Sequence, residues 1–298
     1  MSTAVPARWK RALSVAVTIL LGVSLLGSVT ARGAGRADAR TGAASPEGVA
    51  AATAGSARVL WRPCRDGFQC ARIRLPRDYD RPDGAKIAVS VIRLPAADRA
   101  HRIGPLFMNP GGPGGSGVDL VRELGQILPL ELRGRFDLVG FDPRGILAST
   151  PLRCYRTFDE SFQDLPDFAF PVTTKQENKQ IRSDRKLARA CRTHAGAILG
   201  HMSTADVARD MDAIRAAMGE RRLSYFGYSY GSMLGQTYAN MFPRRARALV
   251  IDGVLDPRAW AGKGPEGHKV PVGTRLHSSL GAQNTLREFF RLCDAARA

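Results

Sequence analysis

One serine lies in a sequence pattern suited to nucleophilic catalysis. Residues Gly227-Tyr228-Ser229-Tyr230-Gly231 match the pattern Gly-x-Ser-x-Gly, whose glycines allow a sharp turn from a strand into a helix that exposes the serine hydroxyl. The N–H groups and positive dipole end at the start of such a helix favour an oxyanion beside the serine. The chemistry indicated is acyl transfer with Ser229 as the nucleophile. A surface turn would also fit this short pattern, so the hypothesis depends on the surrounding elements.

A glycine-rich segment earlier in the chain is a candidate for the rest of an oxyanion hole. Residues 109–117 read Asn-Pro-Gly-Gly-Pro-Gly-Gly-Ser-Gly. One donor in such sites is the N–H of the residue after the serine, here Tyr230, and the other comes from a loop of this kind, here Gly112 or Gly111. A phosphate-binding loop is the competing interpretation. It is less favoured because the segment lacks the Gly-Lys-Ser/Thr ending of a P-loop and does not fit the dinucleotide pattern G-x-G-x-x-G followed by an acidic residue.

Strands and helices are predicted to alternate around these two segments. Apolar runs indicate strands, and apolar residues at helical spacing after a possible cap, Ser203 or Thr204, indicate a helix that Gly219 can end. The predicted strands are 71–75, 86–94, 105–109, 136–141, 223–227 and 248–252, and the predicted helices are 118–128, 206–219 and 232–241. Residues 150–201 are expected to be a polar excursion and not a separate domain. This order predicts an α/β fold with a mostly parallel sheet and helices on both faces.

The composition indicates a globular chain and argues against nucleic-acid binding. The 298 residues are 44% hydrophobic, which suffices for a packed core, and they carry a formal net charge of +17. The arginines are scattered through amphipathic segments without interleaved aromatic residues, unlike the basic stripe of a nucleic-acid surface. No two cysteines have the C-x-x-C spacing of a zinc or redox site, so no metal is expected. Serine chemistry of this kind needs no cofactor.

The first 31 residues have the features of an export signal. A basic start is followed by an uncharged apolar run at 12–29, and Val29-Thr30-Ala31 supplies the small residues that a signal peptidase reads. Cleavage near Ala31 would release a secreted protein with no membrane attachment. A membrane anchor is the open alternative, because the run approaches the length that spans a bilayer. Residues 32–57, rich in Ala, Gly, Ser and Thr, are predicted to be a flexible lead-in.

The five cysteines are expected to form disulfides, because an exported protein matures in an oxidising compartment. Cys64 and Cys70 are close enough in sequence to staple a short loop, and Cys154 and Cys191 flank the polar excursion. Cys293 has no obvious mate in the chain.

Several segments together resemble one family of secreted enzymes. They are the glycine-rich segment 109–117, Phe141-Asp142-Pro143-Arg144-Gly145, the helix 206–219, Tyr225-Phe226-Gly227-Tyr228-Ser229-Tyr230-Gly231, and Val250-Ile251-Asp252-Gly253-Val254-Leu255-Asp256-Pro257. From about Trp61 to Cys293 the chain resembles the secreted tripeptidyl aminopeptidases of actinobacteria, relatives of the proline iminopeptidases with an α/β-hydrolase fold. The resemblance implies an acyl-enzyme on Ser229 and release of short peptides from substrates with free N-termini. One departure is Leu147, near which the family usually has a second glycine.

The rest of a catalytic triad is not evident in the sequence. In this fold the acid and then the histidine follow the serine, each after a later strand. The residues that could fill these positions are Asp252, Asp256, His268 and His277, but they would need two further strands that the sequence does not show. We therefore expect a fragment. Residues 58–260 would form the amino-terminal part of the core, 261–298 would begin a helical lid, and the last strands, most of the lid, the acid and the histidine would lie beyond residue 298.

Two other functions remain open from the sequence. An esterase or lipase could use the same serine turn and glycine loop, because both segments serve any acyl transfer. A non-catalytic exported protein could retain the pocket without the base that makes a serine reactive.

Overall fold

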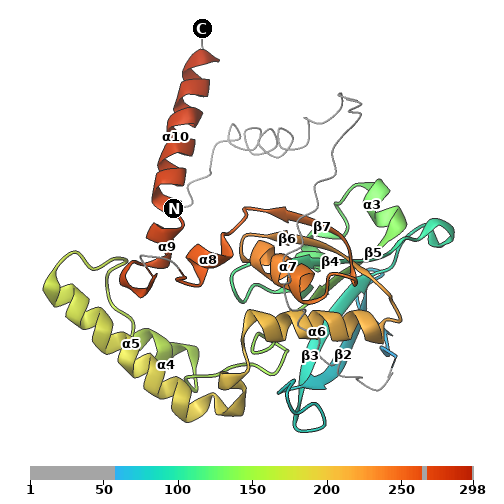
Figure 1. Ribbon diagram of the computed structural model, residues 1–298, viewed down its shortest axis with the longest axis horizontal. Helices are drawn as coiled ribbons and strands as arrows, with labels where there is room; N and C mark the ends of the chain where they lie inside the picture. The colour runs from blue at the N-terminus through green and yellow to red at the C-terminus, as the bar shows by residue number, and fades with distance from the viewer. Residues whose placement is uncertain (1–57, 264–266, 297–298) are drawn as a thin grey trace, which may run out of the picture. The chain divides into compact units, whose positions relative to one another are not determined.

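The computed structural model describes residues 58–263 and 267–296 (Figure 1). The predicted signal peptide, 1–31, and the lead-in, 32–57, lie outside the described residues. Among the helices of the described part, none combines the length and the apolar character needed to cross a membrane.

The described residues form one seven-stranded sheet with the strand order β1-β2-β3-β5-β4-β6-β7. The strands are β1 (Arg62–Pro63), β2 (Gln69–Pro76), β3 (Lys86–Leu94), β4 (Gly104–Asn109), β5 (Phe136–Phe141), β6 (Leu223–Tyr228) and β7 (Ala246–Asp252). Their pairings make β2, β5, β4, β6 and β7 run in one direction and β1 and β3 in the other. The predicted α/β fold with a mostly parallel sheet is confirmed.

The antiparallel end of the sheet was not predicted. β2 pairs with β3 in antiparallel fashion, and so does β3 with β5. Residues 77–85, which join β2 to β3, are too few for the crossover that a parallel pair requires. β1 was missed because a strand of two residues carries no alternating pattern.

Two apolar layers cover the two faces of the sheet. Alternate residues of the central strands point to opposite faces, so Phe107 and Val139 join one core cluster while Met108 and Leu138 join the other. The first cluster contains residues of α6 (Thr204–Ala217) and α7 (Tyr230–Met241), and the second contains residues of α2 (Gly117–Leu124). Helices therefore lie on both faces, as the order of elements predicted.

The helix ends follow local capping. The Ser203 hydroxyl accepts the Asp206 N–H at 3.1 Å and the Asp206 carboxylate accepts the Ser203 N–H at 3.4 Å, so a capping box starts α6 at the predicted place. α2 ends at Leu124, four residues earlier than predicted, with Gly125 as its C-cap. α7 begins at Tyr230, two residues earlier than predicted, directly after the serine.

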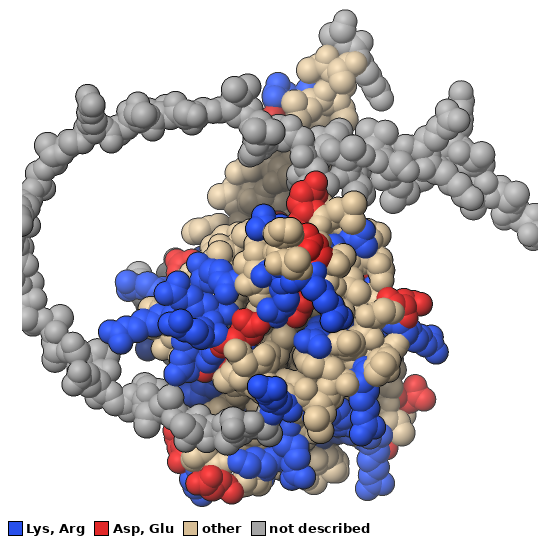
Figure 2. Space-filling view, turned by 90° about the vertical axis from the view of Figure 1, so that its right-hand side faces the viewer, with Lys and Arg blue, Asp and Glu red and all other residues tan. Residues whose placement is uncertain are grey.

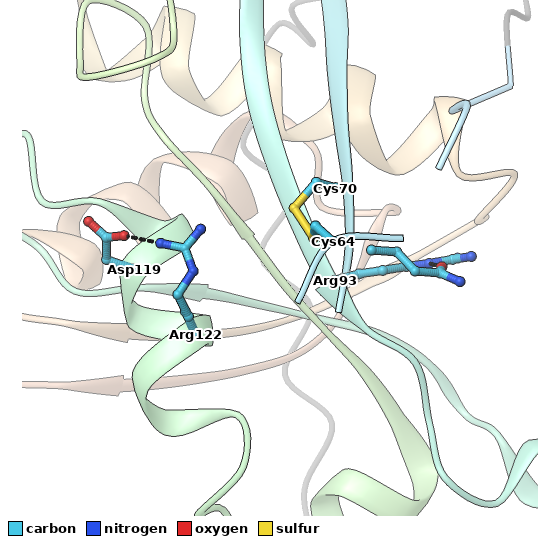
Figure 3. Close-up of a disulfide and its surroundings, with 6 residues drawn as sticks. Cys64, Cys70, Arg93, Asp119 and Arg122 are labelled. Carbon is cyan, nitrogen blue, oxygen red and sulfur yellow. Dashed lines mark hydrogen bonds and ion pairs between the residues drawn. A yellow bond between two sulfur atoms is a disulfide. The ribbon is translucent and has the colours of Figure 1, made fainter. Parts of the chain in front are cut away.

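The excursion contains α4 (Phe158–Gln163), α5 (Thr174–His194) and the 3-10 turn η4 (Gly196–Gly200). A disulfide joins Cys154, before α4, to Cys191 near the end of α5. A second disulfide joins Cys64 to Cys70 at the start of β2 (Figure 3). Both pairs are those expected from the sequence. Cys293 is a free, exposed thiol.

The remaining elements are short or lie toward the carboxyl end of the chain. They are η3 (Arg99–His101), α3 (Leu130–Arg135), α8 (Pro257–Trp260), η5 (Gly267–Lys269), α9 (Val272–Arg275) and α10 (Ser278–Ala295). α10 lies in the segment 261–298 that was expected to begin a helical lid, and none of its residues is buried. β7 is the last strand of the described sheet, and its Val250 is 56% exposed.

Charged side chains are mixed on the visible surface. Figure 2 shows lysine and arginine over much of one face, with acidic and uncharged side chains among them. This distribution fits the scattered arginines of the sequence.

Candidate active site

Ser229 occupies a strained turn between β6 and α7. Its φ of 53° and ψ of −122° lie outside the regions that non-glycine residues usually adopt. Backbone strain of this kind costs about 1–3 kcal/mol and persists only where the surroundings enforce it. The Ser229 N–H donates to the carbonyl oxygen of Asp252 at 2.8 Å, which ties the turn to the end of β7. The residue is exposed, so its hydroxyl is accessible to a ligand.

The two glycines of the serine pattern are required by close packing. A Cβ on Gly227 would stand 2.6 Å from the Tyr225 ring and 2.7 Å from the Gly231 carbonyl oxygen. One on Gly231 would stand 2.8 Å from the Asn109 carbonyl oxygen. The pattern seen in the sequence thus reflects helix α7 pressing against β6 and β4.

The glycine loop lies directly beside the serine turn. β4 and β6 are neighbouring parallel strands in which Asn109 pairs with Gly227, so the segments that follow them leave the sheet at the same edge. Gly111 has a φ of 95°, and a Cβ there would stand 2.9 Å from the Ser229 Cβ. The structure therefore brings together the two segments that the sequence singled out, although they are more than a hundred residues apart.

Hydrogen bonding distinguishes the two glycines considered as oxyanion donors. The Gly111 N–H donates to Asn109 Oδ1 at 2.9 Å, so this hydrogen is already engaged. Gly112 is exposed and has a φ of 113°. Among the described residues, no protein atom accepts a hydrogen bond from the N–H of Gly112 or from that of Tyr230. These two N–H groups remain available to a ligand.

The Tyr230 side chain anchors the start of α7. It is 6% exposed, its hydroxyl forms a 2.7 Å hydrogen bond with Thr204 Oγ1, and its ring lies 5.9 Å from that of Trp260. Burial raises the pKa of the Tyr230 phenol above its usual range, so the phenol is neutral at physiological pH. The sequence indicated Thr204 only as a possible helix cap and did not single out Trp260, because nothing local in either segment marks a partner on α7.

A buried ion pair holds the segment that follows β5. Arg144 and Asp210 have fully buried side chains, with Nη2 to Oδ1 at 2.6 Å and Nε to Oδ2 at 2.8 Å. The other guanidinium hydrogens go to backbone carbonyl oxygens of Pro76, Arg77 and His201. Since every donor of this buried guanidinium is satisfied, the Asp-Pro-Arg-Gly segment is held at several points. The sequence placed Arg144 in a motif but did not indicate its partner.

The two aspartates considered for the rest of a triad are engaged in local hydrogen bonds with the backbone. The Asp252 carboxylate accepts the Gly253 N–H at 2.8 Å, and the Asp256 carboxylate caps α8 through the Arg258 N–H. His277 precedes α10 in a left-handed conformation, and the side chain of His268 lies outside the described structure. Among the side chains that the structure describes, none forms a hydrogen bond with the Ser229 hydroxyl. In the same part of the chain, no group of three or more His, Cys, Asp or Glu residues is placed to hold a metal ion.

Comparison with known proteins agrees with the fold and the serine turn described above. The family model for the alpha/beta hydrolase fold matches residues 104–266. Serine protease Hip1 of Mycobacterium tuberculosis is 37% identical over 249 residues, which cover 79% of this chain and 45% of that protein. Tripeptidyl aminopeptidase of Streptomyces lividans is 38% identical over 222 residues, covering 70% of this chain and 40% of that protein. Carboxylesterase B of M. tuberculosis is 37% identical over 213 residues, covering 66% and 40%.

The chain thus spans less than half the length of these curated relatives. The family model, in contrast, covers more than half of the chain and includes β4 to β7, the serine turn and the glycine loop's strand. Relatives of the chain include proteins named serine protease and tripeptidyl aminopeptidase. By the family match and by its sheet topology, the chain belongs to the α/β-hydrolase fold family.

Proposed function

We propose that the protein is a secreted serine exopeptidase that releases short peptides from substrates with free N-termini, through an acyl-enzyme on Ser229. The observation that carries the proposal is the strained, exposed serine beside two N–H groups that no described residue engages. Relatives named serine protease and tripeptidyl aminopeptidase support a peptidase. The two disulfides support an extracellular location, because such bonds persist in oxidising compartments.

In the proposed reaction the Ser229 hydroxyl oxygen attacks the carbonyl carbon of the scissile peptide bond. A general base outside the described residues takes the hydroxyl proton and returns it to the leaving amine. Water then hydrolyses the acyl-enzyme. The positive-φ turn leaves Ser229 exposed, where a substrate can reach its hydroxyl.

The developing oxyanion is proposed to lie between the N–H groups of Tyr230 and Gly112. Gly111 is the weaker candidate, because its hydrogen would have to leave Asn109 before it could reach a substrate. Removing one donor of an oxyanion hole typically costs about 3 kcal/mol of transition-state stabilisation, so this geometry matters for rate.

A carboxylesterase is the second candidate, favoured by the relative named Carboxylesterase B. The serine turn and the two N–H groups stabilise the oxyanion of an ester as well as that of an amide. A peptidase of the proposed kind must in addition bind the substrate's ammonium group.

The test compares three substrate types on wild type and two variants. Tripeptide anilides with free N-termini, the same anilides acetylated at the N-terminus, and short acyl esters are offered to wild type, Ser229→Ala and Ser279→Ala. Ser279 is an exposed serine on α10 and serves as the matched control. We expect cleavage of the free anilide, at least tenfold less of the acetylated form, and loss of both with Ser229→Ala only. Turnover of esters alone would establish the carboxylesterase instead.

A fluorophosphonate probe tests the serine directly. We expect labelling of wild type and Ser279→Ala, and none of Ser229→Ala. A folded wild type that takes no label and turns over no acyl substrate would show that the proposed enzyme is wrong.

A further inference from the structure

The segment after β5 contacts the glycine loop at two points. The Ser116 hydroxyl, at the end of the loop, donates to Asp142 Oδ1 at 2.6 Å. Closer to the middle of the loop, a Cβ on Gly114 would stand 3.2 Å from Ile146 Cδ1, so the isoleucine side chain lies directly against the backbone there. Both Asp142 and Ile146 belong to the segment that Arg144 fastens to Asp210.

Ser116 joins this contact to the helix. Its hydroxyl oxygen also accepts the Asp119 N–H at 2.9 Å, which caps α2. The next residue, Gly117, packs so tightly that a Cβ would stand 2.5 Å from the Phe141 carbonyl oxygen. The carboxyl end of the loop is therefore held against β5.

The other end of the loop has its own anchor. Asn109 is 1% exposed, and its Oδ1 accepts the Gly111 N–H. Between the two anchors stand residues 112–115, which are Gly-Pro-Gly-Gly. The Gly115 N–H donates to the Gly111 carbonyl oxygen at 3.0 Å and closes this stretch as a turn. Glycine has the largest conformational freedom of any residue, so the orientation of the turn, and with it the position of its N–H groups, depends on how its ends are held.

We propose that Asp142 is a positioning residue that, through Ser116, holds the Gly112 N–H where the oxyanion forms. This inference rests on the proposed function, which assigns Gly112 as a donor. Asp142 acts without touching substrate. Its carboxylate is 3% exposed and is held within the segment that the Arg144 and Asp210 ion pair fixes, so the Ser116 hydroxyl meets an acceptor that cannot move freely. An oxyanion hole depends on donors that are already in place, which is the property this contact supplies.

Kinetics test the proposal with Asp142→Asn and Ser116→Ala. Asp119→Asn is the matched control, because it makes the same change in a neighbouring carboxylate of α2 whose partner is the exposed Arg122 at 2.7 Å (Figure 3). We expect kcat to fall about tenfold in both test variants, with KM within twofold of wild type. This loss is smaller than the hundredfold or greater loss in kcat for a missing donor, because the donor is misplaced and not removed. The control should keep both constants. A proportional rise in KM at constant kcat would overturn the inference.

A double variant tests whether the two residues act through one contact. If they do, Asp142→Asn combined with Ser116→Ala should have about the same kcat as either single variant. Losses that multiply would show two independent effects and contradict the proposed connection.

Amide hydrogen exchange separates this inference from the proposed function. Exchange in residues 110–117 should become at least fivefold faster in Asp142→Asn and Ser116→Ala, and should not change in Ser229→Ala or Asp119→Asn. Unchanged exchange in the loop would overturn the inference whether or not any substrate is cleaved. Absence of acyl turnover in wild type, with faster exchange in the variants, would overturn the proposed function alone. If Asp142→Asn fails to fold, Ser116→Ala gives the same readout, because it removes the same hydrogen bond from the loop side.

Discussion

The serine turn and the glycine loop meet at the same edge of the sheet, but they are held there by different means. The serine turn depends on backbone contacts, because Gly227 and Gly231 allow α7 to press against β6 and β4, and Asp252 receives the Ser229 N–H. The glycine loop is closed by a backbone hydrogen bond from the Gly115 N–H to the Gly111 carbonyl oxygen, but its two ends are held by side chains, namely Asn109 at one end and Ser116 with Asp142 at the other. The comparison indicates that substitution of the two glycines in the serine turn should cost mainly stability, whereas changes in the loop anchors should cost mainly rate.

The largest expected effect on stability comes from the buried ion pair between Arg144 and Asp210, which holds the segment that contains Asp142. Asp210→Asn should lower the free energy of unfolding by about 3–5 kcal/mol, because it leaves the fully buried Arg144 without its charge partner. Denaturant unfolding measures the loss. As a control, Asp167→Asn removes an exposed partner of Lys179 and should change stability by less than about 1 kcal/mol. Equal effects in the two variants would show that burial of the ion pair is not what matters.

A substitution in the serine turn should follow in size. Gly227→Ala should lower the free energy of unfolding by about 2–3 kcal/mol, because the new Cβ would overlap the Tyr225 ring and the Gly231 carbonyl oxygen. Gly134→Ala is the matched control, since a Cβ there meets nothing within 4 Å and the residue lies in α3. It should be neutral or slightly stabilising. If Gly227→Ala has the stability of wild type, the close-packing explanation of the pattern is wrong.

A smaller effect is expected from the Tyr230 side chain. Tyr230→Phe removes the hydrogen bond to Thr204 but keeps the backbone N–H, so stability should fall by about 1 kcal/mol while kcat changes less than threefold. Thermal unfolding and turnover of the same preparation check both parts. A loss of rate with unchanged stability would mean that the phenol, and not the backbone, serves the reaction.

The smallest expected change is a gain in stability. Leu147 is 60% exposed and has a φ of 41°, a conformation that disfavours side chains with a Cβ. Leu147→Gly should therefore raise the free energy of unfolding by about 0.5–1 kcal/mol. In contrast, Leu130→Gly, in helix α3 with 66% exposure, should lower it by about 1 kcal/mol.

Local signals in the sequence were enough to predict most elements. The possible helix cap at Ser203 or Thr204, the apolar run in β5 and the glycines around Ser229 each act within a few residues, and the structure has these elements where they were expected. The antiparallel pairing of β3 with β5 was not predictable in this way, because the two strands are separated by β4 in the chain and not in the sheet.

The sequence by itself determined the fold class and the presence of a serine turn and a glycine loop, because the backbone conformations of both segments require particular residues at fixed spacing. Only the tertiary structure decided which N–H groups are free to bind a ligand. That outcome depends on the hydrogen bond between the Asn109 side-chain oxygen and the Gly111 N–H. It also depends on the contacts of Asp142 with Ser116 and of Asp210 with Arg144, whose partners are 26 and 66 residues apart in the chain. Such contacts follow from the order of strands in the sheet, which no short stretch of sequence encodes.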